Sequence, residues 1–169
     1  IKPRLKGLID HIKSQADVKF MYHTDGSVVP VIDDFIEIGV DILNPIQTSA
    51  MGMDTYAMKE TYGNRICFHG AIDVQQMLPF STVEEVRYDF AKRIYDLGRG
   101  GGYFLSTCHD IGEDVAPENI IVMFESAMEY DQYPLSMEGI LKPEDLNPKP
   151  TSFVQDASIT KKKRRPRRG

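Results

Sequence analysis

The sequence predicts an α/β protein with a parallel sheet. Four short apolar runs are nearly continuous rather than alternating, which is typical of strands covered on both faces; they span residues 18–22, 40–46, 65–70 and 101–107. Helical patterns separate these runs, so the order strand then helix occurs four times. This order favours right-handed crossovers in a parallel sheet. It fits either a doubly wound sheet or about half of a (β/α)8 barrel, and a half-barrel alone would leave open sheet edges and an uncovered apolar face.

Helices are predicted from apolar stripes at three- and four-residue steps and from end signals. They span residues 1–13, 28–39, 54–63, 81–98 and 116–130. Ser81 and Glu84 have capping-box spacing, and Gly98 ends the same pattern. Pro117 lies in the first turn of the last helix. After residue 130 the periodic pattern fades, so the secondary structure that can be predicted ends there.

Composition places the chain among proteins with a hydrophobic core. It has 169 residues, of which 41% are hydrophobic and 27% charged, and no apolar run approaches the roughly 18–20 residues of a membrane span. The first residues lack the apolar region of a signal peptide. Two cysteines, Cys67 and Cys108, form no disulfide framework and exclude a four-cysteine zinc site, which fits a reducing cytoplasm. We expect a cytoplasmic protein and, because the chain starts at Ile1 rather than Met, a fragment or a processed piece.

Charge divides the chain into two parts. The tail after residue 160 carries seven cations, which leaves 13 Lys and Arg against 25 acidic residues and a net charge of −12 for the rest. We expect a folded domain over residues 1–146 and a Pro-containing linker with a basic disordered tail over 147–169. The acidic body argues against nucleic-acid binding except through the tail. One hypothesis is therefore that the chain is a binding module whose basic tail contacts an acidic partner or nucleic acid. The other is that the tail is only a solubilising or linker end.

Polar side chains follow each predicted strand. The candidates are His23, Asp25, Asn44, Gln47, His69, Asp73, Cys108, His109 and Asp110. In a barrel, the carboxyl ends of all strands meet at one mouth, where active sites lie. Spacing does not choose between two chemistries. An imidazole and carboxylate set could hold a divalent metal, or the same residues could bind an anionic substrate or transfer a proton without metal.

Several candidates also have a purely structural interpretation. Asp25 could cap the next helix, Asp73 could cap the turn after it, and Asn44 could be a turn residue before proline. A lone histidine such as His69 is most often a hydrogen-bonded structural residue. Cys67 lies within an apolar run and is expected in the core.

Three segments resemble the C-terminal half of the uroporphyrinogen decarboxylase superfamily. They read YHTDGSVVPVIDDFIEIGVDILNPIQ, YGNRICFHGAIDVQQML and GGYFLSTCHDIGEDVAPENIIVMFESA, and the resemblance covers residues 1–130. It implies an α/β fold that is the C-terminal half, about four βα units, of a (β/α)8 TIM barrel. It also implies that the N-terminal half of the barrel is a missing partner, and that the fragment alone is inactive.

The resemblance is closest in motif to the cobalamin-dependent methyltransferase branch. Its zinc-dependent members carry His-x-Cys after the strand that matches 18–22 and a further Cys after the last strand. His23 matches the histidine, Asp25 stands at the first cysteine, and His109 stands at the second, with Cys108 one residue earlier. The implied metal ligands are His23, Asp25 and His109, and the implied metal is zinc or another divalent ion, because an oxygen-richer set suits harder ions.

This branch implies methyl transfer between a corrinoid protein and a thiol, in which zinc stabilises the reactive thiolate. We expect His23 and His109 to be catalytic and Asn44, Gln47 and Asp73 to bind a small-molecule or tetrapyrrole substrate. The alternative is uroporphyrinogen decarboxylase activity in porphyrin synthesis, which needs no cofactor. His109 matches a histidine after the last strand of that enzyme.

Overall fold

The computed structural model describes residues 1–130 and 132–146. Its elements are α1 (Lys2–Gln15), β1 (Met21–His23), η1 (Val29–Val31), α2 (Ile32–Glu37), β2 (Ile42–Ile46), α3 (Thr55–Tyr62), β3 (Cys67–Ile72), α4 (Met77–Phe80), α5 (Val83–Gly98), β4 (Tyr103–Thr107), α6 (Pro117–Glu129) and α7 (Pro143–Leu146). The predicted linker and basic tail lie outside the described residues. Within the described ranges, no helix is long and apolar enough to cross a membrane.

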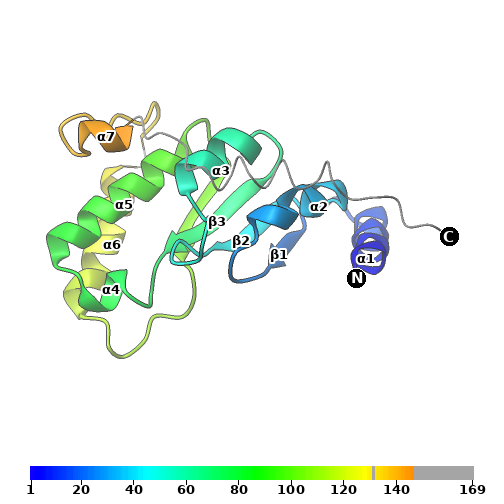
Figure 1. Cartoon of the computed structure of the whole chain (residues 1–169), viewed down its shortest axis with the longest axis horizontal. Helices are drawn as coiled ribbons and strands as arrows, with labels where there is room; N and C mark the ends of the chain where they lie inside the picture. Colours follow the sequence, from blue (N-terminus) through cyan, green and yellow to red (C-terminus); the bar gives the residue numbers. More distant parts are fainter. Residues whose placement is uncertain (131, 147–169) are drawn as a thin grey trace.

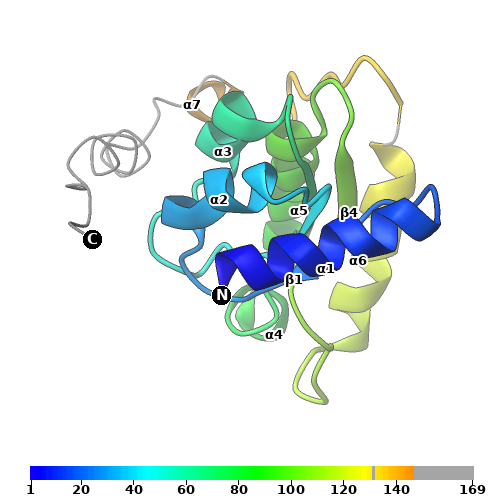
Figure 2. The ribbon, with the colours of Figure 1, turned by 90° about the vertical axis from the view of Figure 1, so that its right-hand side faces the viewer.

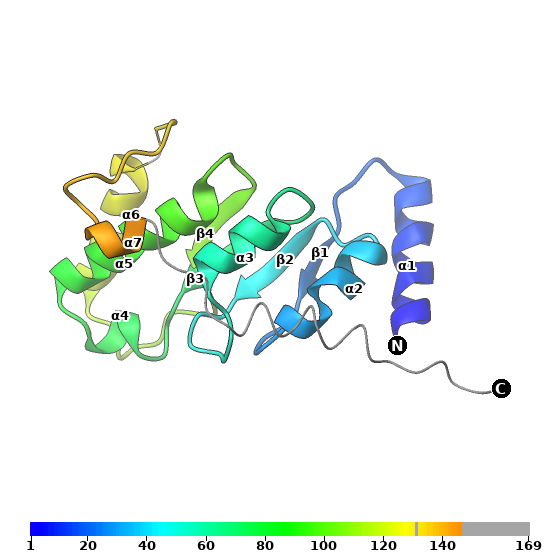
Figure 3. The same cartoon turned by 45° about the horizontal axis from the view of Figure 1, so that its top comes forward.

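The four strands form one parallel sheet in the order β1-β2-β3-β4. The α1 helix lies beside β1 at one end of the molecule, and α5 and α6 lie at the other end (Figure 1). The turned views agree: α1 stands in front of β1 in Figure 2, and the helices and strands form a row from α1 to α6 in Figure 3. This sequential parallel order is that of consecutive strands in a barrel, so the predicted α/β fold is confirmed.

The two faces of the sheet differ in what covers them. On one face, Leu43 and Phe68 of the central strands are fully buried against the helices, with Tyr22 packed beside them. On the other face, Met21 and Phe104 are 46% and 48% exposed, and neither joins a hydrophobic cluster among the described residues. Strands covered on both faces are therefore the wrong description for β1 and β4.

The observed strands begin two or three residues later than the apolar runs. Before β2 and β3 the chain is apolar because it is buried, as with Val40 and Ile66, which are 3% and 4% exposed, whereas Val18 before β1 is 42% exposed. The backbone there is not part of the ladder: the Phe20 carbonyl, for example, accepts from the amides of Asp41 and Ile42 as the chain enters β2. The hydrophobicity of a segment indicates that its residues are buried, and it indicates less precisely where the strand begins.

The capping box of α5 lies one residue later than predicted. The Thr82 hydroxyl accepts from the Glu85 amide at 3.3 Å, and the Glu85 carboxylate accepts from the Thr82 amide at 2.8 Å. The prediction of Ser81 and Glu84 is thus wrong. Both pairs have the same spacing, and the start of the helix at Val83, which makes Thr82 the residue directly before it, decides between them.

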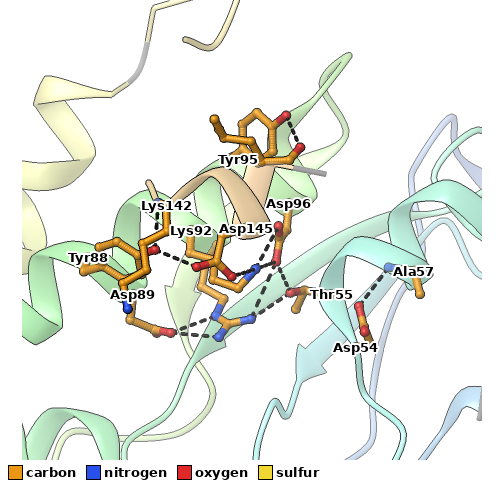
Figure 4. Close-up of polar contacts among 12 residues, drawn as sticks. Asp54, Thr55, Ala57, Tyr88, Asp89, Lys92, Tyr95, Asp96, Lys142 and Asp145 are labelled. Carbon is orange, nitrogen blue, oxygen red and sulfur yellow. Dashed lines mark hydrogen bonds and ion pairs between the residues drawn. The ribbon is translucent and has the colours of Figure 1, made fainter. Parts of the chain in front are cut away.

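A buried polar cluster joins α3 to α5 (Figure 4). Arg93 donates to the Asp89 carboxylate at 2.8 Å and to the Thr55 hydroxyl at 2.7 Å. The same hydroxyl donates to Asp96 at 2.6 Å, and burial raises the pKa of Asp96. These contacts satisfy charged groups inside the helical layer, which fixes α5 behind the sheet.

Candidate functional site

Three polar side chains lie in a row across the sheet: His23 at the end of β1, and Asn44 and His69 within β2 and β3 rather than after them. His23 and Asn44 are partners in the parallel register. Asn44 Oδ1 lies 2.6 Å from Nδ1 of His23, and Asn44 Nδ2 lies 2.7 Å from Nδ1 of His69. His69 also stacks on Phe104, with ring centroids 6.0 Å apart. Burial lowers the pKa of His69, so this imidazole is neutral at neutral pH.

Asp25 faces His23 and does not cap a helix. Its Oδ2 lies 3.4 Å from Nε2 of His23, and both side chains are more than half exposed. The next helical turn, η1, begins after Val28 without a side-chain cap. The Gly26 amide donates to Oε1 of Gln47 at 2.8 Å, which ties the loop after β1 to the loop after β2.

A cavity of about 290 Å³ opens where the loops after the four strands meet. Its lining residues are Asp25, Gln47, Asp73, Val74, Gln75, Cys108 and His109. The His109 side chain is 67% exposed and lies 3.9 Å from Asp110. Residues from all four strand ends thus reach one cavity, although Val74 and Gln75 had no signal in the sequence pattern beyond their place after a strand.

Cys108 and Asp73 have structural partners within this cavity wall. Cys108 is 8% exposed, and its Sγ donates to the Ile46 carbonyl at 3.1 Å. Burial raises the pKa of the Cys108 thiol, so the thiolate is disfavoured. Asp73 accepts from the Gln75 amide at 2.8 Å, as expected for a turn residue. Asn44 has both polar atoms engaged by histidines, and it is therefore more than a turn residue.

The backbone after His69 has a conformation that sequence reasoning missed. Gly70 and Ala71 have φ values of +110° and +91°. A Cβ on Gly70 would lie 3.2 Å from the Ile46 nitrogen and 3.3 Å from Cβ of Pro45, tighter than ordinary contact. For Ala71 this conformation is strained, and such strain collects at functional sites. The Thr48 hydroxyl donates to the Ala71 carbonyl at 3.3 Å, which ties this segment to the loop after β2.

Two of the three predicted ligands fit a divalent metal. Bond lengths of about 2.0–2.1 Å to nitrogen and oxygen place two ligands of a tetrahedral ion about 3.3 Å apart, close to the 3.4 Å between His23 Nε2 and Asp25 Oδ2. His109 does not join them: within residues 1–130 and 132–146, no group of three or more His, Cys, Asp or Glu is arranged to hold a metal ion. His109 would join the pair only after a change in the loop that follows β4.

A parallel α/β layer with polar side chains collected at the carboxyl ends of its strands is the arrangement of (β/α)8 barrel enzymes. The comparison with protein families gives the particular group. The model described as uroporphyrinogen decarboxylase (URO-D) matches residues 1–130. The chain belongs to this family.

Comparisons with individual proteins add the fold of one relative. The structure is similar to that of a methyltransferase from Methanosarcina mazei, with a TM-score of 0.58 and 18% sequence identity. The match covers 78% of this chain and 36% of the methyltransferase, so the chain spans little more than a third of that protein. No curated protein matches the sequence. At this identity, the structural likeness shows the barrel fold.

Proposed function

We propose that the chain forms part of an enzyme that transfers a methyl group between a corrinoid protein and a thiol or related acceptor. The observation that supports this most is the imidazole and carboxylate pair, His23 and Asp25, 3.4 Å apart at the mouth of the sheet. Family membership and the fold of a methyltransferase support it at a coarser level. Because the chain spans 36% of that relative, we expect turnover only when the rest of the barrel is present.

The proposed metal ligands are His23, Asp25 and His109. His23 presents Nε2 toward Asp25, and Asp25 reaches the cavity that His109 also lines. His109 is exposed on the loop after β4, and the proposal requires a change in that loop to bring its imidazole to the pair. A divalent ion such as zinc, when bound, would lower the pKa of an acceptor thiol. Gln47 and Asp73 line the same cavity and would contact the substrate.

Metal content tests this proposal directly. We would measure bound metal by mass spectrometry in the full-length protein, in His23→Ala, in Asp25→Ala and in the control His11→Ala, which removes an exposed imidazole on α1. We expect about one divalent ion per chain in the wild type and the control, and loss of it in the two site variants. Metal-free wild type, or metal retained in His23→Ala, would contradict the proposal.

A second candidate is cofactor-free decarboxylation of uroporphyrinogen to coproporphyrinogen. The family description names this activity, and His109, exposed at the cavity after β4, stands where the resemblance implies a histidine of that enzyme. Conversion of uroporphyrinogen by intact protein stripped of metal with a chelator would support it. The absence of any turnover would remove this candidate.

A further inference from the structure

The Asn44 side chain contacts two imidazole rings with atoms of opposite hydrogen-bonding capacity. Its Oδ1 only accepts and its Nδ2 only donates. The 2.6 Å contact of Oδ1 therefore requires a proton on Nδ1 of His23. The 2.7 Å contact of Nδ2 requires a lone pair on Nδ1 of His69. One amide thus imposes different proton positions on two histidines.

We propose that Asn44 is a positioning residue that holds His23 in its Nδ1–H tautomer and His69 in its Nε2–H tautomer. In this tautomer Nε2 of His23 carries a lone pair, and it faces the Asp25 carboxylate, whose Oδ2 lies 3.4 Å away. Two electron-rich groups at that separation form a ready position for a cation. The assignment of the two tautomers does not depend on the proposed function, whereas their use to bind a metal rests on it.

The surroundings of the two rings explain why a bridge is needed. The His23 side chain is 59% exposed, and contact with water does not hold an imidazole in its Nδ1–H tautomer. A hydrogen bond at one ring nitrogen decides which tautomer the other nitrogen presents. His69 is half-buried and stacked on Phe104, so it anchors the far side of the amide.

Nuclear magnetic resonance of the imidazole nitrogens tests this inference. Two-bond proton–nitrogen correlation spectra distinguish the two tautomers, and the chain has only four histidines, which His23→Gln and His69→Gln would assign. We would record these spectra for the intact, metal-free protein, for Asn44→Asp and for Asn64→Asp. Asn64 lies exposed between α3 and β3, so it is a matched control for the change from amide to carboxylate.

In the wild type we expect the Nδ1–H pattern for His23 and the Nε2–H pattern for His69. A carboxylate at position 44 only accepts, so Asn44→Asp should shift His69 to the Nδ1–H pattern and leave the proton of His23 on Nδ1. Asn64→Asp should change neither ring. A reversed pair of tautomers in the wild type, fast exchange in both rings, or an unchanged His69 in Asn44→Asp would overturn the inference.

A zinc titration of the same samples separates this inference from the proposed function. If the spectra show the expected tautomers and the protein binds no zinc, the role of Asn44 stands and the metal proposal fails. If zinc binds while the tautomers are reversed in the metal-free protein, the role of Asn44 fails and the metal proposal stands.

Discussion

At the scale of single residues, the two cysteines have different surroundings. Cys108 is buried and donates to a carbonyl, and burial raises the pKa of its thiol. Cys67 is partly exposed and lines a separate cavity of about 360 Å³. Because thiolate is the reactive form and Cys108 is also buried from the reagent, we expect iodoacetamide at neutral pH to label Cys67 faster than Cys108. Peptide mass spectrometry over time measures both rates, and faster labelling of Cys108 would contradict the assignment.

Asp41 links three elements through one carboxylate. Burial raises its pKa, but the Lys13 ammonium and the Phe20 amide, which donates at 2.7 Å, outweigh this and hold the pKa below its usual 3.8. A lowered carboxyl pKa stabilises the fold above the unfolded value, and this stability is lost as pH falls through the folded value. The advantage of wild type over Asp41→Asn should thus be largest at neutral pH.

Urea unfolding at pH 7 and at pH 3 measures this dependence. The difference in free energy of unfolding between wild type and Asp41→Asn should shrink at the lower pH. Asp10→Asn, which removes an exposed pair with Lys6, should cost less than about 1 kcal/mol at pH 7. A difference for Asp41→Asn that grows on acidification would contradict the role of the carboxylate.

Residue chemistry explains what the sequence could predict of the site. His23, Asp25 and His109 follow apolar runs directly, so their place at strand ends is legible in a single sequence. The role of Asn44 is not, because it depends on the register of three strands and on a shift in pairing between Leu43 and Ile46. The orientation of the Asn44 amide likewise depends on the side chains around it in the folded chain.

At the scale of elements, the start of α5 offers a matched pair of substitutions. The Thr82 hydroxyl caps the helix, whereas Ser81 contributes a backbone carbonyl to Asn119 at 2.9 Å. We expect Thr82→Ala to lower the free energy of unfolding by about 1 kcal/mol and Ser81→Ala to have a much smaller effect. Thermal or urea unfolding measures both losses, and a loss for Ser81→Ala as large as that for Thr82→Ala would contradict the assignment of Thr82 as the cap.

Elements were predictable where one signal dominates. The apolar stripe of α5 is the face that the helix buries, so the stripe locates this helix well. The glycine that follows α3 marks the end of that helix. The region 28–39 is less regular, since a short η1 precedes α2. Strand starts were placed too early, in β2 and β3 because buried apolar residues such as Val40 and Ile66 directly precede the strand.

At the scale of the whole molecule, coverage of the sheet is asymmetric. Phe68 is fully buried between the sheet and the helices, while Phe104 is 48% exposed on the other face. We expect Phe68→Ala to cost about 3–5 kcal/mol in free energy of unfolding and Phe104→Ala to cost about 1 kcal/mol or less. Urea unfolding of this chain distinguishes them, and similar losses would mean that both faces are covered in solution.

The asymmetry was anticipated from the count of βα units, because half of a barrel has two open edges and an inner face. The alternation of strands and helices also fitted a doubly wound sheet, in which helices would cover Met21 and Phe104. The order β1-β2-β3-β4 decides against that alternative, since a doubly wound sheet reverses its strand order at a switch point.

The close approach at Gly70 has a consequence for how the mouth of the sheet can vary. A Cβ at position 70 would lie 3.2 Å from the Ile46 nitrogen and 3.3 Å from Cβ of Pro45, so the neighbouring strand would have to give by a few tenths of an ångström. The φ of +110° adds backbone strain for any residue other than glycine. Glycine at this position therefore lets β3 approach the chain of β2 beside Asn44 and His69, and a larger residue would alter the spacing of these two strands.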